Sequence, residues 1–199
     1  MKTISSIDEL KEMYDDVVPG ALTKVVSALT PLYQQWIEAS RFTIVSTVGE
    51  QGTDASPRGD RGPVVKIVDA KTLWMPDWRG NNRLDTLQNI VTDGRISLMF
   101  MVPGCNNVVR INGRAVLTAD EEVRGVFKET VAPRTVIVVT IQEAYFQCAK
   151  ALMRSKLWSQ EDQKHKVPTA GQFVGEVQDG FDAKAYDDGY AEYAKDKMW

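Results

Sequence analysis

The stretch RISLMFMVPGCNNVVRINGRAVLT, residues 95–118, decides the fold class of this chain. It contains two runs of large apolar and β-branched residues, 95–102 and 108–118, on either side of the sequence PGCNN. Such runs around a short segment of Pro, Gly and Asn are typical of two antiparallel strands joined by a turn. We therefore expect a hairpin at this place, with a sheet that extends outward from it.

The segments on both sides of this hairpin are also strand-like. Most are short, contain β-branched residues and are bounded by turn residues: RFTIVSTV (41–48), TDASPR (53–58), VVKIVD (64–69), TLWM (72–75) and RTVIVVTI (134–141). Hairpins dominate over strand–helix–strand units, which favours an antiparallel sheet, and we expect this sheet to close as a barrel. The expected fold class is therefore mainly antiparallel β with flanking helices.

Helical patterns are found before, between and after the strands. The segments with apolar spacing or capping residues typical of helices are 6–17, 21–38, 83–91, 120–127, 144–155 and 182–196. Ser6 and Glu9 form a capping-box pattern, whereas Asn82 and Asp120 are suited to cap the helices that follow them. Pro31 is expected to kink or divide the second segment, because proline has no backbone N–H to donate.

The length of 199 residues suits one domain, or one domain with appendages. We expect N-terminal helices over 1–40 that pack on the barrel, the barrel itself over 41–158, and a tail with a short helix over 159–199. The net charge of −3 argues against a nucleic-acid binder, and no apolar run is long enough to span a membrane. With two cysteines and no apolar signal region in MKTISSIDEL, the chain is expected to be cytoplasmic.

Histidine-based chemistry is not expected, because His165 is the only histidine and lies in the polar stretch QEDQKHK. Catalytic triads, Cys–His pairs and poly-histidine metal sites all need a well-placed imidazole. The sequence also lacks the GxxxxGK[ST], GxGxxG, HExxH and CxxC motifs. If the chain is an enzyme, we expect its chemistry to come from a bound cofactor, without an obligatory side-chain acid or base and without a metal.

Positive charge gathers in one part of the chain. Residues 58–83 contain six cationic and three acidic side chains, a local charge of +3. Arg58 follows a strand and precedes Gly59, which allows a ligand to approach the backbone, and Arg83 lies at the start of an expected helix. Free N–H groups at a helix start and a nearby guanidinium together suit a phosphate group. The alternative is that both arginines are surface cations and that Asn82 is only a cap.

Two more polar clusters are candidates for ligand contact. Lys150 and Arg154 are four residues apart on an expected helix, so either an anion lies between them or they complement the helix C-terminus. In RINGR (110–114) the alternate polar residues share one face, and Gly113 interrupts the strand. That glycine favours a bulge or a ligand close to the backbone, and the alternative is an exposed polar face.

Taken together and in order, these segments closely resemble the pyridoxamine-5′-phosphate-oxidase-like flavoproteins. The resemblance rests on SPRGD (56–60), PDWRGNNRLDTLQNI (76–90), RISLMFMVPG (95–104), RINGRA (110–115) and FQCAKALMRSKLW (146–158). It covers about residues 40–160 and is strongest for a subgroup of FMN-dependent enzymes without an assigned substrate. The resemblance implies a split β-barrel and a homodimer, with FMN bound at the interface between the two subunits.

The resemblance also implies which residues hold the cofactor. Arg58 and Gly59 correspond to a family segment at the phosphate and the ring edge, and Asn82, Arg83 and Leu84 to a Ser-Arg-Lys segment at the phosphate. Leu84 replaces the lysine of that segment, so one phosphate cation is missing.

Two other groups of residues complete the implied site. The ring would lie beside Met75, Pro76 and Asp77, where backbone N–H groups could contact it. The partner subunit would contribute Arg110, Lys150, Arg154 and Ser155.

The chain departs from true pyridoxamine phosphate oxidases in two places. Its C-terminus, AEYAKDKMW, lacks their Arg-x-His motif, and Pro63 stands where their pattern has a lysine. We therefore expect FMN binding but not vitamin B6 oxidation. The expected function is an FMN-dependent oxidoreductase that acts on a small organic molecule, with a nicotinamide nucleotide or O2 as second redox partner. The alternatives are a non-catalytic flavin carrier or redox-stress protein, and a deazaflavin- or tetrapyrrole-binding member of the same barrel.

Overall fold

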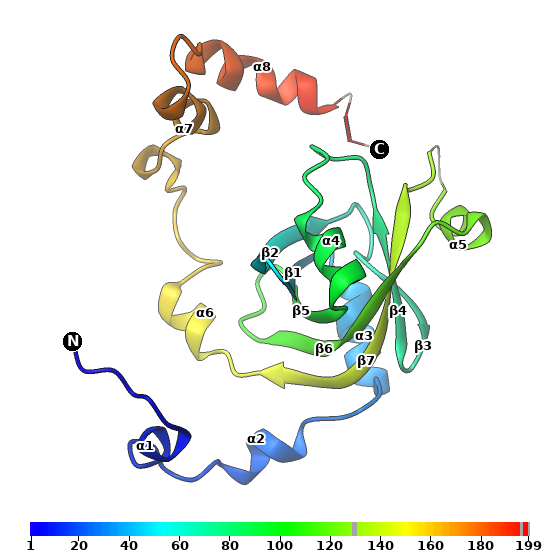
Figure 1. Cartoon of the computed structure of the whole chain (residues 1–199), viewed down its shortest axis with the longest axis vertical. Coiled ribbons are helices and arrows are strands. Elements are labelled where there is room, and N and C mark those ends of the chain that lie inside the picture. Colours follow the sequence, from blue (N-terminus) through cyan, green and yellow to red (C-terminus); the bar gives the residue numbers. More distant parts are fainter. Residues whose placement is uncertain (129–130, 196, 199) are drawn as a thin grey trace.

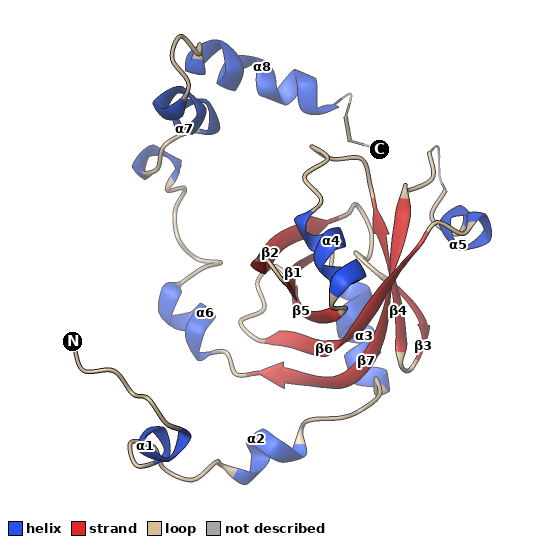
Figure 2. Cartoon of the chain, in the orientation of Figure 1, coloured by secondary structure: helices blue, strands red, loops and turns tan. Residues whose placement is uncertain are grey.

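A single antiparallel sheet forms the centre of the molecule (Figures 1 and 2). The structure, a computed structural model, describes residues 1–128, 131–195 and 197–198. The described part contains a seven-stranded sheet in the order β2-β1-β5-β6-β7-β4-β3. The strands are β1 (Phe42–Gly49), β2 (Gly52–Gly59), β3 (Lys66–Asp69), β4 (Thr72–Asp77), β5 (Arg95–Met101), β6 (Val108–Thr118) and β7 (Thr135–Gln147). With helices beside this sheet, the expected fold class is confirmed.

The sheet is open. β2 and β3 are its end strands and do not pair with each other, so the expected closure of the barrel is wrong while the split-barrel architecture is confirmed. The hairpin that was expected first, β5–β6, lies at the centre and pairs Arg95 with Arg114 and Phe100 with Val109. Long strand β7 pairs with both β6 and β4 and so joins the two parts of the sheet.

Gly113 marks an irregularity between β6 and β7. The register shifts between Asn112 and Gly113, as the sequence predicted for a bulge. A Cβ atom at Gly113 would lie 2.1 Å from the carbonyl oxygen of Thr140, which is far inside van der Waals contact. The close approach that requires glycine here is therefore made by the neighbouring strand.

The core lies against one face of the curved sheet and follows its two-residue alternation. Its fully buried side chains come from the five inner strands and from one helix next to the sheet: Ile37, Val45, Leu73, Met75, Leu98, Phe100, Ile111, Ile137 and Val139. Each fully buried aliphatic or aromatic side chain contributes roughly 1.5–3 kcal/mol through the hydrophobic effect. This packing fixes the strand ends from which the functional site is built.

The N-terminal region contains three short helices: α1 (Ile7–Lys11), α2 (Pro19–Thr23) and α3 (Pro31–Ala39). The side chain of Ser6 caps α1 by accepting the N–H of Glu9, as expected, although the helix is shorter than 6–17. Pro31 divides the second expected helix and takes the first position of α3. The residues between the two pieces are held differently, because Val26 forms a β-bridge with Ala144.

The later helices correct two of the sequence expectations. α4 (Asp85–Thr92) has Leu84, not Asn82, at its N-cap, because Asn82 adopts a left-handed backbone conformation with φ = 61°. The expected helix over 144–155 is wrong in its first part. β7 continues to Gln147 and pairs with β6, and the short helix α6 (Lys150–Ser155) begins only after it.

The remaining helices lie outside the sheet. α5 (Glu121–Gly125) is capped by Asp120 as expected. In the tail, a short 3-10 helix (Lys164–Lys166) and α7 (Ala170–Val177) were not expected. α8 (Ala183–Lys195) confirms the terminal helix, and Asp196, which closed the expected range, lies outside the described residues. No helix in the described chain is long and apolar enough to cross a membrane.

Candidate functional site

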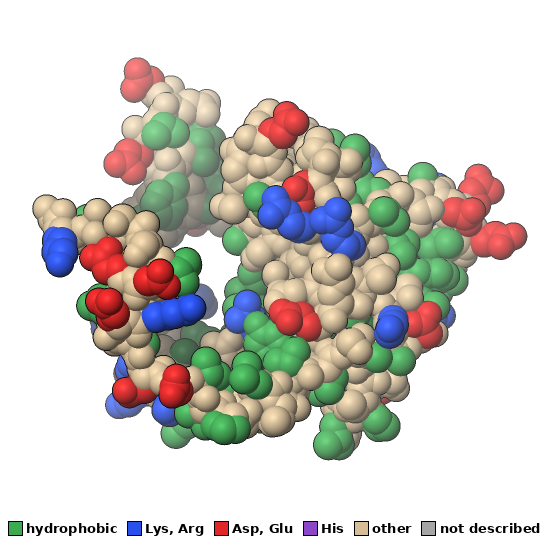
Figure 3. Space-filling model, turned by 60° about the horizontal axis from the view of Figure 1, so that its bottom comes forward, with side chains coloured by type: hydrophobic (Ala, Val, Ile, Leu, Met, Phe, Trp, Pro, Cys, Tyr) green, Lys and Arg blue, Asp and Glu red, His purple; other side chains and the backbone are tan. Residues whose placement is uncertain are grey.

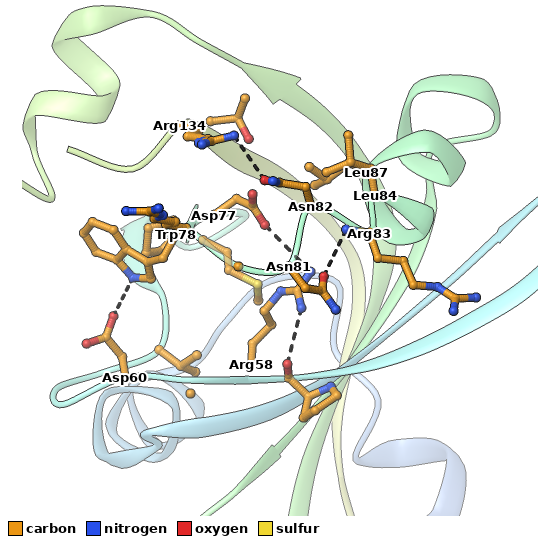
Figure 4. A pocket seen from close by; sticks show the side chains of 18 residues that line it. Arg58, Asp60, Asp77, Trp78, Asn81, Asn82, Arg83, Leu84, Leu87 and Arg134 are labelled. Carbon is orange, nitrogen blue, oxygen red and sulfur yellow. Dashed lines mark hydrogen bonds and ion pairs between the residues drawn. The ribbon is translucent and has the colours of Figure 1, made fainter. Parts of the chain in front are cut away.

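A cationic cleft of about 370 Å³ lies where the ends of β2 and β4 meet the loop that precedes α4 (Figure 4). Four arginines and two aspartates line it, together with apolar side chains of the core edge. The cationic lining residues are Arg58, Arg79, Arg83 and Arg134, and the acidic ones are Asp60 and Asp77. Both the volume and the mixture of apolar walls with a few charged groups are typical of sites for small ligands.

Arg58 extends from the end of β2 into the cleft. Its Nη1 donates to Ser56 Oγ at 2.6 Å and to the Pro57 carbonyl at 3.3 Å, and its Nη2 lies 3.7 Å from Asp77 Oδ1. Its Nε is buried and has no hydrogen-bond partner, which is true of only two other buried side-chain atoms in the described residues. A guanidinium has five N–H donors, and an unpaired buried donor is costly, so Arg58 is a strong candidate to receive an anionic acceptor.

One of those two other atoms belongs to the same cleft. It is the Oγ1 of Thr135, at the start of β7, and Thr135 pairs with Asp77 across the sheet. An unsatisfied hydroxyl and an unsatisfied guanidinium nitrogen therefore both belong to residues that line one cleft. Buried polar groups without a partner are uncommon in folded proteins, which makes their concentration here notable.

Asp77 ends β4 between two of the cleft arginines. Burial raises the pKa of its carboxyl group, and the positive charges of Arg58 and Arg134 partly oppose this rise. The Asp77 backbone carbonyl also accepts the N–H of Arg134 at 3.1 Å, which fixes the position of that arginine at the cleft. The carboxyl group is thus desolvated but remains next to cations.

The loop from β4 to α4 is shaped by two consecutive asparagines. Asn81 Oδ1 accepts the backbone N–H of Arg83 at 2.9 Å, and Asn82 Oδ1 accepts from Arg134 Nη1 at 3.2 Å. Asn is one of the few residues that tolerate the left-handed conformation observed at Asn82. At the other end of the cleft, Trp78 Nε1 donates to Asp60 Oδ2 at 3.0 Å. These hydrogen bonds therefore stabilise a part of the cleft wall that contains no helix or strand.

Arg83 lines the cleft, but its side chain turns away from Arg58 (Figure 4). Its Nε donates to Asp85 Oδ2 at 2.5 Å, and the side chain is 79% exposed. The hydrogen bond and charge of Asp85 raise the pKa of Arg83 further above its already high value. Arg83 therefore lies within reach of the cleft without being committed to it.

The cleft brings together eight of the twelve residues that the sequence identified. These are Arg58, Gly59, Met75, Pro76, Asp77, Asn82, Arg83 and Leu84. Met75 is fully buried beneath it, and Pro76 has no backbone N–H, so this segment offers fewer backbone donors than expected.

Four of the twelve residues do not line the cleft of their own chain. Arg110 lies on β6 with its guanidinium 5.2 Å from the Tyr145 ring, and its Nη1 donates to Gln147 Oε1 at 3.3 Å. Lys150, Arg154 and Ser155 are exposed on α6. The sequence had assigned all four to the partner subunit, and that assignment stays a prediction.

Arg134 is a cationic residue of the cleft that the sequence did not single out. It directly precedes β7 and reaches the cleft because β7 pairs with β4, a strand about 60 residues earlier in the chain. The β-branched pattern of residues 134–141 indicated the strand but not its neighbour. The register of that pairing would have been needed to find it.

The fold and the site together define a class of protein. It is the class of open antiparallel split barrels with an arginine-lined cleft at the strand ends. The chain belongs to the pyridoxamine 5′-phosphate oxidase family, whose sequence profile matches residues 29–148. The match runs from the residues before α3 to the end of β7 and so contains all the strands of the described sheet.

Solved structures share this fold. A single-residue variant of HupZ from Group A Streptococcus is 18% identical, with a TM-score of 0.50 over 59% of this chain and 98% of that chain. A candidate pyridoxamine 5′-phosphate oxidase from Lactobacillus delbrueckii is also 18% identical, with a TM-score of 0.50 over 60% of this chain and 95% of that chain. Identities this low establish the fold alone. No curated protein matches the chain in sequence.

Proposed function

We propose that this chain binds FMN in the cationic cleft and acts as an FMN-dependent oxidoreductase on a small organic molecule. The observation that carries the proposal is Arg58, whose guanidinium lines the cleft with a buried Nε that has no partner. FMN would supply hydride and single-electron transfer, which no side-chain set in this sequence offers. The second redox partner would be a nicotinamide nucleotide or O2.

The residues present fit such a cofactor. A phosphate needs several N–H donors and positive charge, and Arg58, Arg134 and the start of α4 lie together at the cleft. A planar ring needs apolar walls, and Gly59, Met75, Pro76 and Leu84 provide them. Since four arginines face two aspartates, the lining carries an excess of positive charge that suits a dianionic phosphate.

We assign the following roles to the side chains. Arg58 and Arg83 bind the phosphate, and Asn82 holds Arg134 beside it. Asp77, at the end of β4, lies along the ring. The protein therefore orients the cofactor and stabilises negative charge on it, and no side chain acts as an obligatory acid or base.

We further propose that the functional unit is a homodimer with the cofactor at the interface. α1, α6, α7 and α8 lie away from the sheet (Figure 1). Figure 3 shows an open gap between the main body of the molecule and a segment that lies away from it. These helices expose apolar side chains that a monomer would leave in water, among them Ile7, Leu10, Met153, Phe173 and Tyr193. A second copy would cover them and bring Arg110, Lys150, Arg154 and Ser155 to the cofactor.

The other parts of the proposal concern organisation and place in the cell. We assign residues 1–40 to N-terminal helices that pack on the barrel, of which α3 buries Ile37 in the core, residues 41–158 to the cofactor-binding barrel, and residues 159–199 to a C-terminal tail with a short helix. The proposed location is the cytoplasm, and nucleic acids and membranes are not among the proposed partners. The net charge of −3 supports this last point.

The absorption spectrum of the protein tests the proposal. Purified protein is incubated with excess FMN, separated from free cofactor, and its visible spectrum is recorded. We expect a yellow protein with one flavin per chain, whose flavin, in the presence of excess nicotinamide nucleotide as electron donor, is reduced again after each transfer and so passes electrons repeatedly to O2 or an added acceptor. A colourless protein would overturn the proposal. A tetrapyrrole or deazaflavin spectrum would show that the protein binds one of these cofactors in place of FMN. A flavin that is reduced and reoxidised only once, without turnover, would show that the protein is a carrier.

A further inference from the structure

Arg83 is shared between two adjacent cavities. One is the cationic cleft, and the other, of about 310 Å³, lies between the β1–β2 hairpin and α4. The second cavity is lined by carboxylates, namely Glu50, Asp54 and Asp85, and Arg83 is its one lysine or arginine among the described residues. The same guanidinium thus stands between a cationic site and an acidic one.

Asp85 is the hydrogen-bond partner of the Arg83 guanidinium at the second cavity, and the charge of Asp54 acts on the same guanidinium. Asp85 is the first residue of α4, it lines only the second cavity, and its Oδ2 accepts from Arg83 Nε at 2.5 Å. The backbone of Arg83 is fixed independently, because Asn81 Oδ1 accepts its N–H. Arg83 therefore keeps its place in the loop while its side chain is drawn away from Arg58, as Figure 4 shows.

We propose that Asp85 is a positioning residue that sets the affinity for the cofactor phosphate by competing with it for the Arg83 guanidinium. This inference rests on the proposed function, since it requires that Arg83 binds the phosphate. When the phosphate enters the cleft, the guanidinium leaves the carboxylate and turns toward the anion. The exposed ion pair between Arg83 and Asp85 is lost in that exchange. The affinity for the phosphate is therefore lowered by the free energy of this ion pair.

The size of the effect follows from the exposure of the pair. Arg83 is 79% and Asp85 43% exposed at the side chain, so water screens their attraction. Exposed pairs of this kind change an equilibrium by a factor of about two to five. Removal of the Asp85 charge should therefore tighten FMN binding about two- to fivefold, without a new contact to the cofactor.

The experiment compares FMN with riboflavin, which has the same ring and no phosphate. Dissociation constants are measured by quenching of flavin fluorescence for the wild type, Asp85→Asn and Glu50→Gln. Glu50 is the matched control, because it gives a carboxylate to the same cavity without a hydrogen bond to Arg83. We expect Asp85→Asn to tighten FMN about two- to fivefold and to leave riboflavin unchanged, whereas Glu50→Gln changes neither. Equal tightening of riboflavin, or an equal effect of Glu50→Gln, would overturn the inference.

A double-mutant cycle separates competition from simple charge repulsion. In the Arg83→Gln background, Asp85→Asn should no longer change the affinity for FMN, because there is no guanidinium to release. If the gain persists there, the carboxylate repels the phosphate directly and the inference fails. Asp85→Asn also removes an acidic residue from the first turn of α4, so its melting temperature is measured alongside. A loss of stability with unchanged affinity would likewise count against the inference.

The same titrations separate this inference from the proposed function. If the wild type binds neither flavin, or binds both equally, the phosphate site itself is wrong. If the wild type prefers FMN and Asp85→Asn leaves that preference unchanged, only the role of Asp85 is wrong.

Discussion

Arg58 and Asp77 lie on strands that are not neighbours, yet Arg58 Nη2 is 3.7 Å from Asp77 Oδ1. Arg58 belongs to β2, which is one end of the sheet, and Asp77 ends β4, next to the other end strand. The pair therefore spans the opening at which the barrel is split. The cleft lies at this opening because the end strands β2 and β3 do not pair with each other and so leave the strand ends there accessible.

The carboxyl group of Asp77 should make stability depend on pH. Its pKa is raised in the folded protein, so the folded state favours the protonated form, and stability is lost as pH rises through that raised pKa. Asp77→Asn removes this dependence. The quantity of interest is the melting temperature of Asp77→Asn minus that of the wild type. We expect this difference to be more positive at about pH 7 than at about pH 4. Thermal unfolding followed by circular dichroism measures this, and a relative gain that is larger at the lower pH would show that the sign is wrong.

Arg83 should matter for the phosphate and not for the ring. We expect Arg83→Ala to weaken FMN binding by about tenfold or more, because a charge-assisted hydrogen bond to the phosphate is lost. Arg61 is the matched control, since it belongs to the same cationic part of the sequence but does not line the cleft. An unchanged dissociation constant in Arg83→Ala, or an equal loss in Arg61→Ala, would remove Arg83 from the site.

Gly113 should resist substitution for a steric reason. In Gly113→Ala the new methyl group would meet the Thr140 carbonyl oxygen at 2.1 Å, and β6 and β7 would have to move apart. We expect a loss of about 1–3 kcal/mol in the free energy of unfolding. Gly125→Ala is the control, because no atom lies within 4 Å of its Cβ position, and it should be close to neutral. Urea denaturation measures both, and similar values for the two variants would contradict the account of the bulge.

The contribution of α6 from the partner subunit can be tested by mixing two defective copies. Arg58→Ala removes one arginine of the cleft, and Arg154→Ala removes one of the residues proposed to come from the partner. Each variant alone should bind FMN weakly. After they are unfolded and refolded together, random pairing should restore about one quarter of the sites, because one of the two sites in each mixed dimer is intact. No restoration would show that Arg154 acts within its own chain or not at all.

Local patterns predicted most of the fold. The hairpin of residues 95–118, the break at Pro31 and the caps at Ser6 and Asp120 depend on nearby residues, and all are confirmed. The failures have non-local causes. Residues 144–147 have an apolar pattern compatible with a helix, but they are extended because residues 108–111 of β6 pair with them.

The site could be predicted only in part for the same reason. The residues near 58 and 75–84 were found from composition and resemblance, since they lie close in the sequence. Asn82 was misread as a cap because its positive φ value is not visible in the sequence. Arg134 was missed because its neighbourhood depends on the register of β7 against β4.

The central claim is that Arg58 holds the phosphate of FMN in the cleft. The most direct measurement is the ratio of the dissociation constants for riboflavin and FMN in the wild type and in Arg58→Ala. The account predicts that the wild type binds FMN much more tightly than riboflavin, and that Arg58→Ala loses about 2–4 kcal/mol of FMN binding while riboflavin binding changes little. Equal affinity of the wild type for both flavins, or an undiminished preference for FMN in Arg58→Ala, would contradict it.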